Sequence, residues 1–248
     1  MGLENYSKDY SQFFNNHKQA NNKRVGRLFY ILMTIFGLGS IAFATLPAVF
    51  WNLSTGKRLG AKIENLPVPI SEVIVENPLT LGNIQVVKDP DGFTYFTTTY
   101  NPPKETEEYK LRPQEFYISI PKLKIERAIT KVDSLNFKNN QSHFPATALP
   151  GEIGNSFITG HSSLPQFANP KDYDSIFTKL PSLKIGDEVY VDIDGKNLKF
   201  LVQFLKVVDP QDLSVLAPIS KTGRNLTLMT CVPPGTSTKR LVVITSLI

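Results

Sequence analysis

Cysteine is almost absent from this chain, since its 248 residues contain only Cys231. A lone cysteine excludes an intramolecular disulfide, so the fold has to be stabilised by its core rather than by covalent cross-links. Histidine is scarce as well, with three residues. No acidic cluster indicates a calcium site, so we expect no metal ion and no other cofactor.

Basic residues exceed acidic ones, but they do not form the dense stripe that is typical of nucleic-acid binding. The formal net charge is +5. Residues 1–27 contribute +3 of it, from five Lys and Arg against two acidic residues, and the rest of the chain contributes +2. Aromatic residues are not interleaved with basic ones in a patch, so we expect no nucleic-acid partner.

One long hydrophobic run stands out near the N-terminus. Residues 28–51 contain no charged residue, and as a helix they would span about 36 Å, enough to cross a membrane with some tilt. Lys23, Arg24 and Arg27 precede the run, which predicts a cytoplasmic N-terminus and an extracellular remainder. We expect a disordered cytoplasmic tail over 1–27 and a single-pass transmembrane anchor over the run.

A cleaved signal peptide is the alternative interpretation of this run. Ala42-Phe43-Ala44 resembles the small-residue site at which such peptides are cut. The run continues beyond that site to Trp51, however, and 27 residues precede it, which favours an uncleaved anchor. An anchor predicts a full-length protein that resists a carbonate wash of the membranes, whereas cleavage predicts a mature chain that begins at Thr45.

The remainder of the chain is typical of a β protein. It is rich in Phe, Tyr, Val, Ile and Thr, and the 18 Pro and 15 Gly of the sequence indicate many turns. We expect strands at 116–120, 123–130, 155–160, 188–192, 197–208, 226–230 and 241–248, and a short helix over 172–180. This pattern favours a closed or nearly closed β-barrel of about seven or eight strands over residues 115–248.

Residues 52–114 are expected to form an extracellular linker between the anchor and the barrel. Within it, Ile84–Val87 and Phe93–Phe96 predict two extra strands, because Asp89-Pro90-Asp91-Gly92 between them is a good turn sequence.

Cys231 is the candidate nucleophile of the chain. At an unperturbed pKa of about 8.5 only a few per cent of such a thiol is ionised at pH 7, so a nearby His or Arg is needed. His17 lies in the predicted cytoplasmic tail, His143 in a predicted loop, and His161 at the end of an apolar strand. Taken singly, each residue is more typical of a structural role, and only their combination indicates a site.

Three motifs occur in order along the second half of the chain. They are Gly154-Asn155-Ser156-Phe157-Ile158-Thr159-Gly160-His161, Thr227-Leu228-Met229-Thr230-Cys231, and Arg240-Leu241-Val242 after a proline-containing loop. Over about residues 115–248 this chain resembles the sortases, membrane-anchored cysteine transpeptidases of bacterial cell surfaces. The resemblance assigns no subclass.

The resemblance implies a role for four residues. Cys231 would attack the Thr–Gly carbonyl of an LPxTG-like sorting signal and form a thioacyl-enzyme. His161 would protonate the leaving amine and later deprotonate the incoming one. Arg240 would donate hydrogen bonds to the oxyanion or hold the substrate backbone, a role that suits its planar fork. Thr230 would help to shape the substrate groove.

The partners implied are surface proteins that carry a sorting signal, an amine acceptor (a cell-wall peptide or a pilin lysine), and the membrane. Two other functions stay open, namely a cysteine peptidase that hydrolyses similar peptides and a non-catalytic surface β-module. Whether Asp89-Pro90-Asp91-Gly92-Phe93 acts as the lid of pilin-type enzymes is also open, although a simple hairpin turn is favoured. Peptide specificity would come from loops 162–172 and 209–225.

Overall fold

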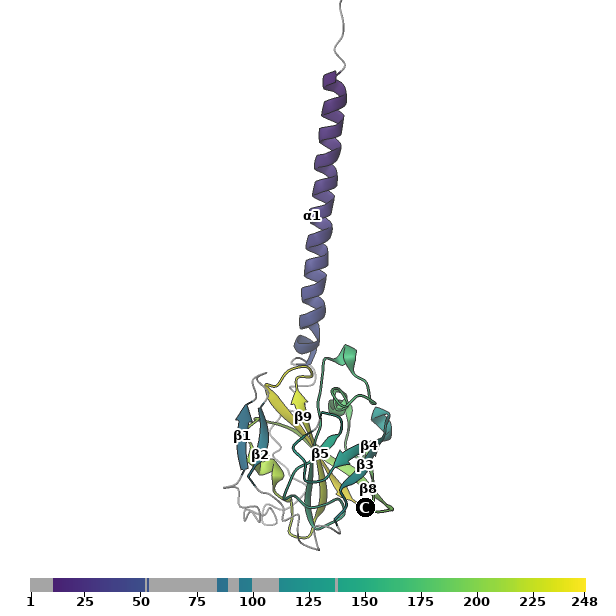
Figure 1. Ribbon diagram of the computed structural model, residues 1–248, viewed down its shortest axis with the longest axis vertical. Helices are drawn as coiled ribbons and strands as arrows, with labels where there is room; N and C mark the ends of the chain where they lie inside the picture. The colour runs from purple at the N-terminus through teal and green to yellow at the C-terminus, as the bar shows by residue number, and fades with distance from the viewer. Residues whose placement is uncertain (1–10, 52, 54–83, 89–93, 100–111, 137) are drawn as a thin grey trace, which may run out of the picture. The chain divides into compact units, whose positions relative to one another are not determined.

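The computed structural model describes residues 11–51, 53, 84–88, 94–99, 112–136 and 138–248 (Figure 1). They belong to two compact units, an N-terminal unit that ends at Pro47 and a second unit that begins at Ala48.

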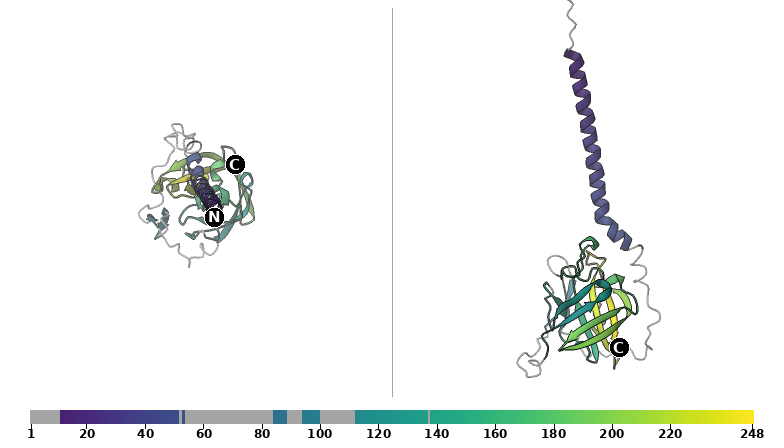
Figure 2. Two further views of the ribbon diagram at one scale, coloured as in Figure 1. Left: turned by 90° about the horizontal axis from the view of Figure 1, so that it is seen from above. Right: turned by 90° about the vertical axis from the view of Figure 1, so that its right-hand side faces the viewer.

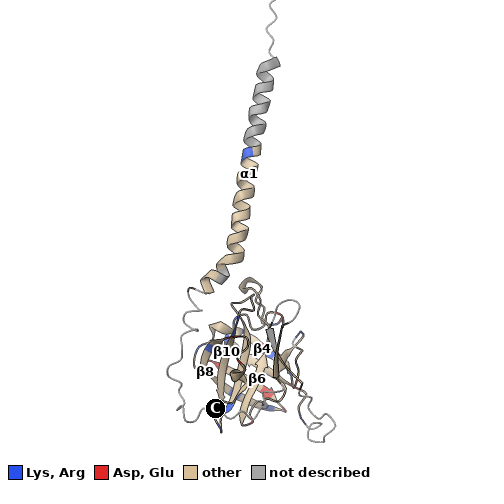
Figure 3. Ribbon diagram, turned by 90° about the vertical axis from the view of Figure 1, so that its left-hand side faces the viewer, with Lys and Arg blue, Asp and Glu red and all other residues tan. Residues whose placement is uncertain are grey.

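The first unit contains most of a long helix, α1, which spans Ser11–Phe50. Residues Gly26–Leu46 are long and apolar enough to cross a membrane, and no charged residue follows Arg27 within the helix (Figure 3). The expected apolar helix is therefore confirmed. The expected disorder is wrong for residues 11–27, which are helical, since residues 11–25 contain no Gly or Pro to interrupt a helix.

The second unit contains a closed barrel of eight strands, as the sequence predicted (Figure 2). Its order is β10-β8-β7-β3-β4-β5-β6-β9. The strands are β3 (Glu115–Ile120), β4 (Ile125–Lys131), β5 (Gln141–His143), β6 (Gly154–Thr159), β7 (Glu188–Ile193), β8 (Lys196–Val208), β9 (Arg224–Val232) and β10 (Lys239–Leu247). Closure leaves no unpaired strand edge.

Two strand pairs in the barrel are parallel, β4 with β5 and β6 with β9, and the other pairs are antiparallel. Parallel neighbours need a long crossover connection, and β7 and β8 lie in the connection from β6 to β9. The carboxyl ends of β6 and β9 consequently meet at one rim of the barrel, although 64 residues separate the two strands.

The barrel strands bury side chains in two separate clusters. The interior cluster takes alternate residues of each strand, such as Phe116, Ile118 and Ile120 of β3. β6, β9 and β10 are buried on both faces, because a second group of side chains covers their outer surface. This outer cluster consists of Phe96, Phe144, Phe157, Val208, Val215, Leu216, Met229 and Val242.

The two strands expected in the linker are present as an antiparallel pair, β1 (Ile84–Lys88) and β2 (Thr94–Thr98). The predicted turn and lid segment, 89–93, lies outside the described residues. Phe96 of β2 reaches the outer cluster, with its ring centroid 6.1 Å from that of Phe157 and 6.3 Å from that of Phe144. This pair of strands therefore covers part of the outer surface of β6.

The connections are short turns and four 3-10 helices within the described part of the barrel, η4 (Pro121–Leu123), η5 (Pro165–Phe167), η6 (Leu180–Ser182) and η7 (Leu213–Leu216). The α-helix expected over 172–180 is wrong, because the segment is a series of turns before Pro181. Its apolar residues nevertheless pack inward, as Ile176 and Phe177 are buried. The β7–β8 turn is as predicted, with positive φ at both Asp194 and Gly195.

Candidate active site

The carboxyl ends of β6 and β9 bring His161 and Cys231 to the same rim of the barrel. The parallel ladder pairs Thr159 with Met229 as its last register step. One step further, the Gly160 N–H donates a hydrogen bond to the Met229 carbonyl at 3.2 Å. His161 and Cys231 each lie two residues beyond that last register pair, so the barrel unites two motifs that are 70 residues apart in the sequence.

Arg240 approaches the same place from the other side of β9. β10 runs antiparallel to β9, and Arg240 is the direct partner of Cys231 in the ladder. Side chains of such directly opposed residues share one face of the sheet, with Cβ atoms about 5 Å apart. The Arg240 side chain is only 2% exposed, and its Nη1 donates hydrogen bonds to the carbonyls of Ser237 (2.9 Å) and Lys239 (3.0 Å). These carbonyls hold the guanidinium in a defined orientation.

The environment of Cys231 disfavours the thiolate in the resting protein. Burial raises the pKa of the thiol above its ordinary value, and the positive charge of Arg240 opposes this shift without cancelling it. The thiol is therefore largely protonated at neutral pH. A nucleophilic role then requires a base that takes the proton as the sulfur attacks.

The ionisation of Cys231 gives a first testable prediction. The rate of alkylation by iodoacetamide, an uncharged reagent, should rise with pH with a midpoint above that of an ordinary thiol. Arg240→Gln should move the midpoint higher still, because it removes the cation that favours the thiolate. The rate is measured by mass spectrometry across pH. Lys239→Gln removes the exposed cation that precedes Arg240 in the chain, and it should leave the midpoint unchanged. A lower midpoint in Arg240→Gln would contradict this interpretation.

Thr230, expected to shape the substrate groove, is 2% exposed. Its Oγ1 donates a hydrogen bond to the Gly160 carbonyl at 2.9 Å, so its contact is with the end of β6. Gly160 itself is required by packing, since a Cβ there would lie 2.6 Å from a ring carbon of the buried Phe177. The same residue is bonded to the next position in the chain, since the Phe177 N–H donates to the His161 carbonyl at 3.0 Å.

The other two histidines do not belong to this group. His17 lies in α1, in the N-terminal unit. His143 was expected in a loop, but it forms part of the short strand β5, which the sequence pattern missed because its three residues are polar. It is completely buried.

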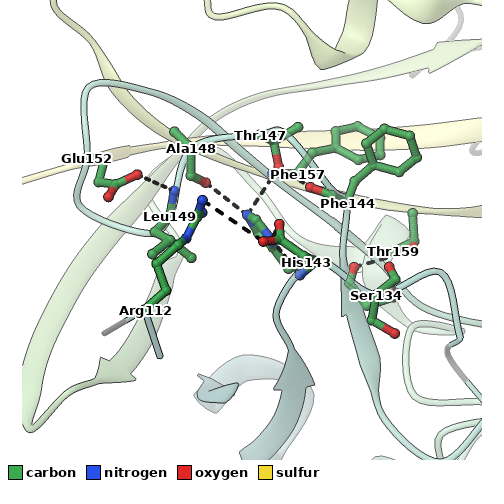
Figure 4. Close-up of polar contacts among 12 residues, drawn as sticks. Arg112, Ser134, His143, Phe144, Thr147, Ala148, Leu149, Glu152, Phe157 and Thr159 are labelled. Carbon is green, nitrogen blue, oxygen red and sulfur yellow. Dashed lines mark hydrogen bonds and ion pairs between the residues drawn. The ribbon is translucent and has the colours of Figure 1, made fainter. Parts of the chain in front are cut away.

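His143 is the centre of a separate polar network (Figure 4). Its Nε2 lies 2.9 Å from the Ala148 carbonyl and 3.1 Å from Thr147 Oγ1. Its Nδ1 lies 3.4 Å from the Asp133 N–H and 3.6 Å from the Asp133 carboxylate. Arg112 Nη1 approaches that carboxylate at 4.0 Å. None of these described contacts involves the residues at the rim, so the network connects the loops beside β5.

Substitution of His143 should therefore affect stability rather than chemistry. His143→Leu removes the imidazole that neighbours the Ala148 carbonyl and the buried Asp133 carboxylate, which should lower the free energy of unfolding by about 1–3 kcal/mol. Chemical denaturation measures that loss. Turnover of a peptide substrate below the unfolding transition should stay close to that of the wild type. A loss of turnover with unchanged stability would instead place His143 in the catalytic machinery.

Two features of this region were missed by the sequence interpretation. Ser162 Oγ donates to the Cys231 carbonyl at 2.7 Å, and a polar residue directly after the Gly-His pair was the only local indication.

Asn155 accepts a hydrogen bond from Thr227 Oγ1 (2.7 Å) and donates one to the Val215 carbonyl (3.1 Å). It thereby ties the β8–β9 connection to β6, a contact across 60 residues that no local pattern predicts.

A closed barrel that brings a thiol, an imidazole-bearing residue and a buried guanidinium to one rim is typical of an enzyme with a cysteine nucleophile. The sortase domain model matches residues 118–248, more than half of the chain, so this chain belongs to the sortase family. Members of the family are generally cysteine transpeptidases that act on surface proteins.

Several solved sortases are similar to the chain. Sortase A from Corynebacterium diphtheriae is 27% identical over 60% of this chain and 72% of that chain, with a TM-score of 0.48. Sortase C-1 from Actinomyces oris is 29% identical over 54% and 72%, with a TM-score of 0.46. The complex of Streptococcus agalactiae sortase C1 and MTSET is 25% identical over 60% and 78%, with a TM-score of 0.49. No curated protein matches the chain.

Proposed function

We propose that this sortase is a membrane-anchored cysteine transpeptidase that cleaves an LPxTG-like sorting signal and joins the cleaved protein to an amine. The observation that supports it most is the meeting of three motif residues at one rim of the barrel. His161 and Cys231 follow neighbouring parallel strands, and Arg240 is the direct ladder partner of Cys231.

The proposed reaction has two halves. In the first, His161 takes the thiol proton as the Cys231 sulfur bonds to the Thr carbonyl carbon of the Thr–Gly bond; the C–N bond then breaks, and the amine leaves with that proton. In the second, an acceptor amine attacks the thioester and gives a proton to His161, the C–S bond breaks, and His161 returns the proton to the Cys231 sulfur. Arg240 donates hydrogen bonds to the oxyanion of both tetrahedral intermediates.

The residues around these three have supporting roles in the proposal. Thr230 shapes the groove indirectly, because its buried hydroxyl holds the end of β6. The residues after His161 and the β8–β9 connection, over 162–172 and 209–225, contact the peptide and set its specificity. The partners are surface proteins with a sorting signal and, as acceptor, a cell-wall peptide or a pilin lysine.

The proposed location is the cell membrane, with the N-terminus in the cytoplasm, the apolar part of α1 as a single-pass anchor, and the catalytic domain outside. Residues 52–114 then form the linker that precedes the domain at 115–248. The apolar stretch Gly26–Leu46 supports the anchor. Full-length protein that is retained after a carbonate wash is the expected result, and a mature chain that begins at Thr45 contradicts it.

The decisive experiment is incubation of the full-length protein, in detergent, with a library of sorting-signal peptides. Mass spectrometry should detect a thioacyl adduct on Cys231 for the cognate peptide, and none in Cys231→Ala. Addition of a primary amine should convert the products from free acid to amide. Free acid alone, at any amine concentration, identifies a hydrolytic peptidase. A Cys231 that forms no adduct and resists labelling by MTSET identifies a non-catalytic module.

A further inference from the structure

A side-chain hydrogen bond continues the pairing of β6 with β9 beyond the last backbone hydrogen bond between them. The Met229 carbonyl points toward β6 and receives the Gly160 N–H at 3.2 Å. Carbonyls two residues apart in a strand point the same way, so the Cys231 carbonyl is the next acceptor on that side. It receives the Ser162 hydroxyl at 2.7 Å, a normal length for an O–H···O bond. A side chain thus supplies the donor that the next backbone N–H of a longer strand would supply.

A second side chain closes the same junction from the opposite strand. Thr230 Oγ1 donates to the Gly160 carbonyl at 2.9 Å. His161 lies between Gly160 and Ser162, and both of these neighbours are hydrogen-bonded to the segment Met229–Cys231. The backbone of the proposed acid–base residue is therefore held on both sides by the strand that carries the proposed nucleophile.

We propose that Ser162 is a positioning residue, whose hydroxyl fixes the spacing between His161 and Cys231; this rests on the proposed roles of those two residues. Its hydrogen bond makes the segment after β6 follow β9 for one further step. Proton transfer between a thiol and an imidazole depends steeply on their separation. A single hydrogen bond at this point can accordingly control turnover through the spacing of the two side chains.

Two other contacts of this segment attach it to a different part of the domain. The His161 carbonyl accepts the Phe177 N–H at 3.0 Å, and the Ser163 N–H donates to Thr178 Oγ1 at 2.9 Å. Both attach the segment to the turns of 172–180 rather than to β9. Cys231, for its part, stays paired with Arg240 on β10. Without the Ser162 hydroxyl, the two bonds at Gly160 remain, but the chain beyond His161 loses its hydrogen bond to Cys231.

The test compares Ser162→Ala, Ser162→Thr and the control Ser182→Ala in the full-length protein. The control removes an exposed hydroxyl outside the peptide-binding loops, whose hydrogen bond, to the Lys179 carbonyl at 2.8 Å, is local. We expect kcat of Ser162→Ala on the cognate peptide to fall about tenfold or more, with KM close to that of the wild type. Ser162→Thr keeps the donor and should restore kcat, and Ser182→Ala should match the wild type. Thermal unfolding should change little in all three.

The pH profile of iodoacetamide alkylation of Cys231 provides a readout that needs no peptide. In Ser162→Ala the profile should shift toward that of His161→Ala, because the imidazole is held less closely to the thiol. An unchanged profile and unchanged kcat overturn the inference, and so does a loss of kcat that Ser162→Thr fails to restore. If the wild type forms no thioacyl-enzyme with any peptide, the proposed function fails, while the alkylation profiles still decide the role of Ser162.

Discussion

Replacement of Arg240 by Lys should remove most of the turnover and keep the fold. Loss of one preorganised donor to an oxyanion lowers kcat by about 10²–10³, and we expect a reduction of that size in Arg240→Lys. The guanidinium uses Nη1 to bond the carbonyls of Ser237 and Lys239, which orients the rest of its planar fork. An ammonium on a flexible stem has three donors without that fixed geometry. It therefore keeps the charge beside Cys231 but loses the directed hydrogen bonds.

Steady-state kinetics on the cognate peptide, with circular dichroism as the check on folding, measures this effect. Lys239→Gln is the matched control, because it removes a cation one residue away whose side chain is 49% exposed. That variant should turn over like the wild type. Near-normal kcat in Arg240→Lys would show that Arg240 does not stabilise the oxyanion by directed hydrogen bonds. Its role would then be limited to the electrostatic effect of its charge on the Cys231 thiol.

Loss of the His161 imidazole should be severe for an amide substrate and mild for an activated ester. General acid–base catalysis typically contributes 10²–10⁴-fold, so kcat of His161→Ala on a peptide should fall by about that factor. An amine is expelled poorly unless it is protonated, whereas a phenolate leaves without a proton. A peptidyl phenyl ester with the same acyl sequence should therefore acylate Cys231 in His161→Ala far faster than the amide does.

Two variants make this comparison specific. Cys231→Ala should be inactive on both substrates, because it lacks the sulfur that accepts the acyl group. His143→Leu should cleave both substrates at rates close to those of the wild type, since His143 is buried in its own network with Asp133 and Thr147. Equal losses on amide and ester in His161→Ala would contradict a role for His161 as the acid, and would favour a role in binding.

The barrel itself was largely predictable, because its signal is local. Strands such as β3 alternate between buried and half-buried residues, and the apolar residues Phe116, Ile118 and Ile120 show the same alternation in the sequence. The hairpin between β7 and β8 follows from Asp194-Gly195, which tolerates positive φ at both positions. The apolar run of α1 needs only its length and composition to be recognised.

The misses arise where tertiary contacts override local preference. The segment 172–180 has the apolar spacing of a helix, but Phe177 N–H is used by the His161 carbonyl, and the segment settles into turns instead. β5 has three polar residues, Gln141, Ser142 and His143, and no apolar alternation. It becomes a strand because β4 and β6 on either side supply its pairing, and its polar side chains are buried.

The sequence alone indicated which residues are able to carry chemistry, because a thiol, an imidazole and a guanidinium have their reactivity wherever they lie. It also determined that a mainly β domain follows an apolar helix, since hydrophobic spacing and turn residues act over a few positions. Only the tertiary structure decided how Cys231 is used. Burial raises its pKa, Arg240 is placed opposite it by the register of β9 and β10, and the Ser162 hydroxyl joins its carbonyl to the segment of His161. The last two of these contacts link residues 9 and 69 positions apart, and such distances are closed by strand pairing, which no short stretch of sequence encodes.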